Sequence, residues 1–178
     1  MGAINHVFLV GEVKEITEEF EHGGDNFVSV VMQLQSGKLI NARGKKELLV
    51  IDGLTHKFQG EIRTRKEEKG NAEFFWVQRI LPVEAMENEV YLCGKLYSKK
   101  PMAKTKQDVP VINFKMIIKN PTNDKLYNII SCEAYANNAV IIDAMDVTTS
   151  LVVAGRMSSL ARNENTYNSV YVKTVSAL

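Results

Sequence analysis

Short apolar runs alternate with polar, glycine-containing segments along the whole chain. The runs are rich in β-branched and aromatic residues and end at Gly, Asn, Asp or charged clusters, which is the pattern of β-strands. In the first half the pattern predicts strands at residues 6–16, 27–35, 38–44, 55–65 and 73–82. In the second half it predicts strands at residues 89–98, 110–119, 126–135, 150–158 and 168–176.

One segment of the second half departs from the strand pattern. Residues 137–145 form an apolar stretch that is too long for a tight turn, and they predict a helix between the third and fourth strands. At the corresponding place the first half has only residues 46–49, enough for about one helical turn.

Two segments of the first half recur in the second half in the same order. Residues 5–13 and 88–96 share Asn, Val, Leu and Gly at an offset of 83 residues. Residues 58–63 and 153–158 share a glycine at an offset of 95 residues. We therefore predict an internal duplication, with one domain at 1–86 and a second at 87–178. Pro82 ends the strand that precedes the boundary, which we place near residues 84–87.

Five strands with a helix between the third and fourth are the layout of the OB-fold, a five-stranded Greek-key barrel. We therefore predict an all-β chain of two tandem OB-fold barrels, of which the second carries the helix. Gly11 and Gly94 in the first strands, and Gly60 and Gly155 in the fourth, suit such a barrel because a residue without Cβ allows a sharp bend. Glycines at ordinary bulges of a β-sandwich are the alternative.

The composition is that of a globular protein, with 45% hydrophobic and 24% charged residues, and this excludes a disordered chain. No apolar run reaches the length of a membrane span, and we expect no signal peptide because the N-terminus lacks a basic region and a long apolar core. Cys93 and Cys132 lie inside apolar strands, which favours free thiols and a cytoplasmic setting.

The net charge of +1 conceals an asymmetry between the two halves. Residues 1–86 hold 11 basic and 13 acidic side chains, whereas residues 87–178 hold 11 basic and 8 acidic ones. A nucleic-acid-binding protein is often more basic than this, so the positions of the charges matter more than their sum.

The second half resembles the bacterial single-stranded-DNA-binding protein family over nearly its whole length. Residues 88–96 match the family's opening strand, an Asn-x-Val-x-Leu-x-Gly-x-Leu pattern, and residues 111–114 resemble its second strand. Residues 130–139 are similar to the third strand running into the helix, and residues 152–156 to the fourth strand with its Gly-Arg pair. The first half resembles the family more loosely, in its opening strand and in residues 60–65.

The resemblance implies sequence-tolerant binding of single-stranded DNA in replication, recombination or repair. It also implies an assembly of about four OB-folds, and therefore a homodimer of this chain. The family's flexible linker and acidic tip, which recruit repair and replication enzymes, have no counterpart after residues 175–178, so we do not expect recruitment by that route. The primosomal replication protein of the same superfamily lacks such a tail and binds both single strands and helicase partners.

Binding a single strand requires cations along the phosphates and aromatic faces for the bases. The loop between the first two strands of the second half, which OB-folds commonly use for oligonucleotides, supplies candidates in Tyr97, Lys99, Lys100, Lys104 and Lys106. A solvated loop whose lysines only aid solubility is the alternative.

The resemblance adds further candidate residues in the second half. Tyr135 stands where the family has a base-stacking aromatic residue, Tyr127 lies near another such position, and Arg156 belongs to the Gly-Arg pair. Tyr135 could equally pack in the barrel with its hydroxyl group hydrogen-bonded.

Candidates in the first half compete with acidic neighbours. Arg63, Arg65 and Lys66 could reach phosphates, but they run into a hairpin tip at residues 67–69 whose glutamates could pair with them instead. Phe74 and Trp76 share one strand face, for which we predict an interface between barrels or subunits, with base stacking as the alternative.

The segment from Glu15 to Asp25, predicted as the first loop, holds five acids and no Lys or Arg, so it would repel phosphate. We therefore expect the second half to bind and the first half to serve as a scaffold.

No arrangement of residues predicts catalysis, a metal site or a cofactor. His6, His22 and His56 are far apart in sequence, and no Cys/His spacing matches a zinc site. Two functions from different classes remain: a single-strand-binding protein, and an OB-fold protein-interaction module that has little or no affinity for DNA and contacts replication proteins.

Overall fold

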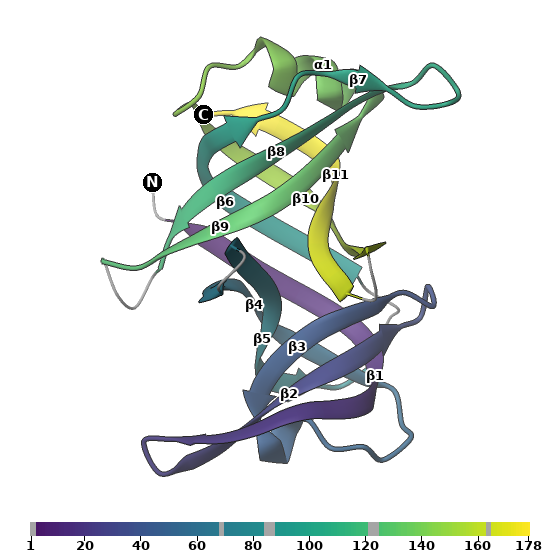
Figure 1. Ribbon diagram of the computed structural model, residues 1–178, viewed down its shortest axis with the longest axis vertical. Coiled ribbons are helices and arrows are strands. Elements are labelled where there is room, and N and C mark those ends of the chain that lie inside the picture. The colour runs from purple at the N-terminus through teal and green to yellow at the C-terminus, as the bar shows by residue number, and fades with distance from the viewer. Residues whose placement is uncertain (1–2, 68–69, 84–87, 121–124, 163–164) are drawn as a thin grey trace. The chain divides into compact units, whose positions relative to one another are not determined.

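The computed structural model describes residues 3–67, 70–83, 88–120, 125–162 and 165–178. The chain divides into two compact units (Figure 1). Unit 1 consists of Met1–Asn5, Val90–Met157 and Ser169–Leu178, and unit 2 consists of His6–Glu89 and Ser158–Asn168. The predicted boundary at residues 84–87 and residues 68–69 of the predicted hairpin tip lie outside the described residues.

Unit 2 is built on five strands, and their bounds are β1 (Ile4–His22), β2 (Asp25–Leu34), β3 (Leu39–Lys45), β4 (His56–Glu67) and β5 (Gly70–Leu81). The strands pair in the order β1-β2-β3-β5-β4, and β4 pairs with β1, so they form a ring. All these pairs are antiparallel except β3–β5, which is parallel. A short 3₁₀ helix, η1 (Lys46–Leu48), follows β3.

Unit 1 repeats this arrangement with one helix and one short strand added. Its elements are β6 (Asn88–Lys99), β7 (Ala103–Lys104), β8 (Pro110–Lys119), β9 (Tyr127–Tyr135), α1 (Ala136–Ala144), β10 (Ser150–Arg162) and β11 (Asn165–Ala177). The ring runs β6-β8-β9-β11-β10 and back to β6, and β9–β11 is its parallel pair. The prediction of two OB-folds, with a helix after the third strand of the second only, is confirmed.

Each barrel is filled by alternate residues of its strands. Leu9, Met32, Ile40, Phe58 and Phe75 are fully buried in unit 2. The corresponding core of unit 1 includes Leu92, Leu96, Ile112, Met116 and Ile118. Because side chains alternate across a strand, the intervening residues point outward and form the outer face of each barrel.

Two glycines of the fourth strands lie where another backbone approaches closely. A Cβ atom at Gly60 would stand 1.9 Å from the carbonyl oxygen of Trp76, and one at Gly155 would stand 2.3 Å from that of Tyr171. Neither distance leaves room for a methyl group. The repeat therefore conserves the same close contact between the fourth and fifth strands in both barrels.

The predicted acidic loop in the first half is mostly strand. β1 continues to His22 and pairs with β2 up to a turn at Gly23 and Gly24, both of which have positive φ. The register shifts between Val13 and Glu15 and again between Ile16 and Glu18. These bulges interrupt the regular alternation of side chains, and for this reason the strand could not be recognised from its pattern.

The beginning of β11 belongs to unit 2 and contacts β3. The side chain of Asn168 is buried and bridges the backbone of Asn41: the Asn41 N–H donates to Asn168 Oδ1 at 3.0 Å, and Asn168 Nδ2 donates to the Asn41 carbonyl at 2.8 Å. Asn41 Nδ2 in turn donates to the carbonyl of Thr166 at 2.7 Å. The buried amide is thus satisfied by main-chain groups.

Candidate nucleic-acid interface

The outer face of unit 1 is formed by the outward side chains of β8, β9, β10 and β11. Cross-strand neighbours in this face include Lys115 with Ser131 and Asn113 with Glu133. Tyr171 of β11 lies beside Glu133 of β9 in the parallel pair. We define the outer face of unit 1 as Asn113, Lys115, Ile117, Tyr127, Ile129, Ser131, Glu133, Tyr135, Arg156, Tyr171 and Lys173.

A stack of two rings and a guanidinium group lies at one end of this face. The rings of Tyr135 and Tyr171 are 5.5 Å apart and nearly parallel, with an interplanar angle of 26°. The guanidinium carbon of Arg156 lies 4.6 Å from the centroid of Tyr171. Arg156 is exposed, and no ion pair holds it within the described residues. The end of the stack therefore presents a cation beside an aromatic surface.

The hydroxyl group of Tyr135 is bound to Glu133, two residues earlier on the same strand face. Burial, together with the hydrogen bond and the charge of Glu133, raises the pKa of Tyr135 to about 12. The phenol is therefore neutral at physiological pH. Tyr135 packs on Tyr171 and also contributes to the outer face, so the two alternatives proposed for this residue are compatible.

Unit 1 carries exposed cations that have no carboxylate partner among the described residues. Three of them point from the strands and two from the segment that joins β6 to β8; these are Lys95, Lys115, Lys173, Lys100 and Lys106. Lys104 differs, because its ammonium group pairs with Asp108 at 2.8 Å. The segment is itself ordered: β7 pairs with β8, and the Thr105 hydroxyl accepts hydrogen bonds from the main-chain N–H groups of Gln107 and Val109.

Lys99 lies on the opposite side of its strand. It pairs with Phe114, whose ring is in the core, and directly opposite residues of an antiparallel pair point to the same face. Its ammonium group donates to the carbonyl groups of Asp143 and Met145 (2.8 Å for Met145) at the end of α1. A cation at this end offsets the partial negative charge of the helix terminus. Lys99 thus caps the helix and is not available to phosphates of the outer face.

Replacing Lys99 and replacing its neighbours should have separate effects. Lys99→Ala is expected to lower the free energy of unfolding by about 1 kcal/mol, because the last carbonyls of α1 lose their cation. A double variant of Lys100→Ala and Lys106→Ala should leave thermal unfolding unchanged and reduce the salt dependence of DNA binding by about 1.4 in log–log slope, which corresponds to two phosphate contacts. Calorimetry and salt titration measure the two quantities, and a stability loss in the double variant would contradict the assignment.

A groove lies at the other end of the outer face of unit 1. It has a volume of about 540 Å³, and its lining includes Lys95, Ile117, Lys119 and Tyr127. Tyr127 is 52% exposed and begins β9, whereas Tyr135 ends it. Eight steps along the strand, at about 3.3 Å each, place the two tyrosines about 26 Å apart. Tyr97, on β6, is also exposed, at 48%.

The outer face of unit 2 contains an aromatic cluster. Phe74 and Trp76 point outward from β5 while Phe75 between them is buried. The ring of Trp76 lies 5.5 Å from Phe27 and 6.4 Å from Phe74, and Phe27 stacks on Phe20 at 5.6 Å. Phe74 and Trp76 therefore pack against rings of their own barrel, and an interface at this face stays a prediction.

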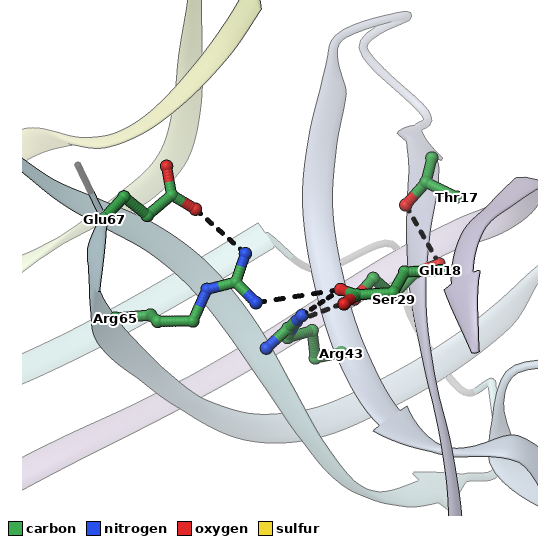
Figure 2. A network of polar contacts seen from close by, with 6 residues as sticks. All are labelled: Thr17, Glu18, Ser29, Arg43, Arg65 and Glu67. Atoms are coloured by element: carbon green, nitrogen blue, oxygen red, sulfur yellow. Dashed lines mark hydrogen bonds and ion pairs between the residues drawn. The ribbon is translucent and has the colours of Figure 1, made fainter. Parts of the chain in front are cut away.

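The cations of this face in unit 2 are held by acids. Arg63 lies over Trp76 at 4.4 Å and pairs with Glu61, whose side chain is only 5% exposed. Arg65 pairs with Glu67 at 2.9 Å and lies 3.7 Å from Glu18 (Figure 2). Lys66 is exposed. The pairing of Arg65 with an acid of its own hairpin is the alternative foreseen for the first half.

The sequence-based search missed Tyr171, the central member of the stack. The offset of 95 residues that aligns Gly60 with Gly155 also aligns Trp76 with Tyr171. The signal was therefore present in the repeat. The repeat does not predict that Arg156 lies over the ring of Tyr171. In the first half the guanidinium over Trp76 belongs to Arg63, which occupies a different position of the fourth strand from Arg156.

Within the described residues, no cluster of three or more His, Cys, Asp or Glu side chains could hold a metal ion. In the same part of the chain, none of the helices has both the length and the apolar character needed to cross a membrane.

Comparison with known proteins identifies the fold. No protein-family model matches the chain, and no curated protein matches its sequence. The wild-type single-stranded DNA binding protein from Thermus aquaticus has a TM-score of 0.77 at 16% identity, and the match covers 100% of this chain and 94% of that one. A deletion mutant of the same protein gives a TM-score of 0.77 at 16% identity, covering 99% and 95%.

Protein PriB from Ralstonia solanacearum matches 52% of this chain and 99% of its own, with a TM-score of 0.44 and 17% identity. The likeness to the Thermus aquaticus protein extends over the whole of this chain and nearly the whole of that one. This chain therefore has the fold of that single-stranded DNA binding protein, and the OB-fold implied by the sequence resemblance is confirmed.

Proposed function

We propose that the chain binds single-stranded DNA without sequence preference, through the outer face of unit 1. The observation that carries the proposal is the stack of Arg156, Tyr171 and Tyr135 on a face whose lysines Lys115 and Lys173 have no carboxylate partner within the described residues. Aromatic faces accept any base because every base has a π-face, and free cations follow the phosphates. The role in replication, recombination or repair implied by the sequence resemblance belongs to this proposal.

The proposed path follows β9 from Tyr135 to Tyr127. Over this distance of about 26 Å, Lys115 lies between the stack and the groove beside Lys95, so cations accompany the path at both ends and in the middle. Glu133 is the one acid that we place on this face, and its carboxylate accepts a hydrogen bond from the hydroxyl group of Tyr135. The expected footprint is a few nucleotides per unit, as in other OB-folds.

In this proposal unit 2 serves as a structural scaffold and does not itself bind DNA. Its arginines beside the aromatic cluster are each in contact with a carboxylate, whereas Arg156 beside the stack of unit 1 has no such contact within the described part of the chain. Each carboxylate therefore competes with a phosphate for the same guanidinium, because both are bound through the same fork geometry.

Titration of a labelled oligothymidylate into the chain at two salt concentrations tests the proposal. We expect binding tighter than micromolar at low salt that weakens steeply as salt increases, since each single-strand phosphate contact adds about 0.7 to the log–log slope. Trp76, the single tryptophan, lies in unit 2, and its fluorescence should not change on binding. Absence of binding at low salt would refute the function, and quenching of Trp76 would show that unit 2 also binds.

A protein-interaction module is the second candidate function, and one observation favours it. In unit 2 the segment between η1 and β4 exposes Val50, Ile51 and Leu54 at 46%, 55% and 60%. Exposed apolar side chains close together in sequence are typical of contact surfaces. Replication proteins are the partners implied by the sequence resemblance. The homodimer expected from the same resemblance stays a prediction, which light scattering of the chain can test.

A further inference from the structure

The β1–β2 hairpin of unit 2 directs an acid and an aromatic ring onto the outer face of its own barrel. The register shift between Ile16 and Glu18 brings Glu18 opposite Ser29 and Phe20 opposite Phe27. Ser29 is in turn opposite Arg43 of β3. A bulge of this kind changes the face to which the following side chains point. The hairpin thus adds Glu18 and Phe20 to the face that carries Phe74 and Trp76.

One carboxylate oxygen of Glu18 is the centre of the polar network in Figure 2. Oε2 accepts a hydrogen bond from the Ser29 hydroxyl at 3.1 Å and forms an ion pair with the guanidinium of Arg43. The guanidinium of Arg65 lies 3.7 Å from the same oxygen. The Ser29 hydrogen bond and then the two arginines lower the pKa of Glu18, so the carboxylate is charged at neutral pH.

Arg43 is enclosed by rings as well as by polar groups. Its guanidinium carbon lies 4.9 Å from the centroid of Phe20 and 5.4 Å from that of Phe74, and its side chain is only 13% exposed. Its Nε donates to the Ser29 hydroxyl at 2.7 Å. A cavity of about 180 Å³ adjoins the network, and its lining includes Glu18, Arg65 and Phe74.

The arginines and rings of this network are the groups that a binding site for a single strand requires. The Glu18 carboxylate occupies the position that a phosphate of the ligand would take. Two guanidiniums converge on one anionic oxygen, and guanidiniums bind carboxylate and phosphate oxygens through the same fork geometry. The ring of Phe20 lies against Arg43 where a base could stack. We propose that the outer face of unit 2 is a second binding site for single-stranded nucleic acid, which Glu18 holds closed. This inference depends on the proposed function only for the choice of ligand.

Removal of the Glu18 charge should open the site. In Glu18→Gln, Arg43 stays between Phe20 and Phe74 but loses its ion-pair partner, whereas Arg65 keeps its ion pair with Glu67. A largely buried guanidinium without an anion is unfavourable, so a phosphodiester oxygen that replaces the carboxylate is bound more strongly than in the wild-type chain. Glu18 is about half exposed, so the substitution leaves the barrel core intact.

The fluorescence of Trp76 reports on this site. Trp76 is the single tryptophan and contacts Phe74, one of the two rings that enclose Arg43. In Glu18→Gln, saturation with an oligothymidylate is expected to quench Trp76 and to steepen the log–log salt dependence by about 0.7, which corresponds to one added phosphate contact, at Arg43. Unchanged Trp76 fluorescence in this variant, or quenching already in the wild-type chain, would overturn the proposal.

Glu19→Gln is the matched control. It removes the same charge from the same hairpin, but Glu19 pairs with Lys46 at 2.7 Å and makes no contact with either guanidinium. The control should bind like the wild-type chain, without a response of Trp76. Equal quenching in both variants would mean that hairpin charge alone matters, and this would refute the role of Glu18.

A second background separates this inference from the proposed function. Arg156→Ala weakens the site in unit 1 and leaves the network of unit 2 untouched. In the combined variant Glu18→Gln, Arg156→Ala, quenching of Trp76 should persist although overall affinity is reduced. Failure of wild-type binding together with quenching in this variant would refute the proposed function alone, whereas wild-type binding without any quenching would refute the second site alone.

Discussion

Gly60→Ala is expected to destabilise unit 2 by about 3 kcal/mol, because the added methyl group clashes with the backbone of β5. The new Cβ would stand 1.9 Å from the Trp76 carbonyl oxygen and 2.8 Å from the ring of Phe75. The first contact is with backbone, so relief requires a shift of β5 itself and of the pairing between β4 and β5. Urea unfolding followed by Trp76 fluorescence measures the loss next to the clash.

Gly53→Ala provides the matched control for this prediction. Gly53 has a φ of +73°, and a Cβ there would meet nothing within 4 Å. Its substitution should therefore cost only the left-handed backbone strain of about 1–2 kcal/mol. If the two variants unfold at the same urea concentration, the close approach of Gly60 to β5 does not determine the stability of unit 2.

Tyr171→Ala is expected to lower the affinity for an oligothymidylate by about 5- to 150-fold, which corresponds to the loss of one stacking contact of 1–3 kcal/mol. The substitution removes the central ring of the stack, so Arg156 loses its cation–π partner and Tyr135 loses the ring against which it packs. The two remaining groups then lie at separate positions without a shared surface. Fluorescence anisotropy at fixed salt measures the change.

Tyr171→Phe separates the ring from the hydroxyl group. It retains the aromatic face that Arg156 and Tyr135 contact, so its affinity should stay within about threefold of the wild-type value, on the view that base stacking carries the contact. A Tyr171→Ala variant that is folded and binds as tightly as the wild-type chain would exclude the stack as the site. A loss of equal size in both variants would show that the hydroxyl group, and not the ring, is required.

The two barrels use one framework with opposite electrostatics. Trp76 and Tyr171 occupy equivalent outward positions of the fifth strands, and each lies under a guanidinium from the fourth strand. In unit 2 that guanidinium is neutralised by the nearly buried Glu61, and the first hairpin carries acids. In unit 1 the guanidinium has no carboxylate partner within the described residues, and the segment from β6 to β8 carries lysines. The two barrels thus share one strand framework and differ in the charge of their outer faces.

The sequence by itself determined the barrels, their order and the position of the helix. Alternating apolar residues identify strands because each strand buries one face, and the repeated glycines mark the same crossing of strands in both halves. These are local signals, each carried by a few neighbouring residues. The acidic part of β1 was predicted as a loop instead of a strand. Two bulges and the outward acids of this segment disrupt the alternation of apolar and polar residues on which the strand prediction depends.

Only the tertiary structure decided which candidate side chains share a surface. Lys99 and Lys100 are adjacent in sequence, yet the ammonium group of Lys99 caps α1 while Lys100 is exposed. Tyr171 meets Tyr135 through the parallel pairing of β9 and β11, and Glu18 meets Arg43 across three strands. Strand pairing between distant segments is set by the register of the whole barrel, and neither the composition nor the spacing of the individual residues records that register.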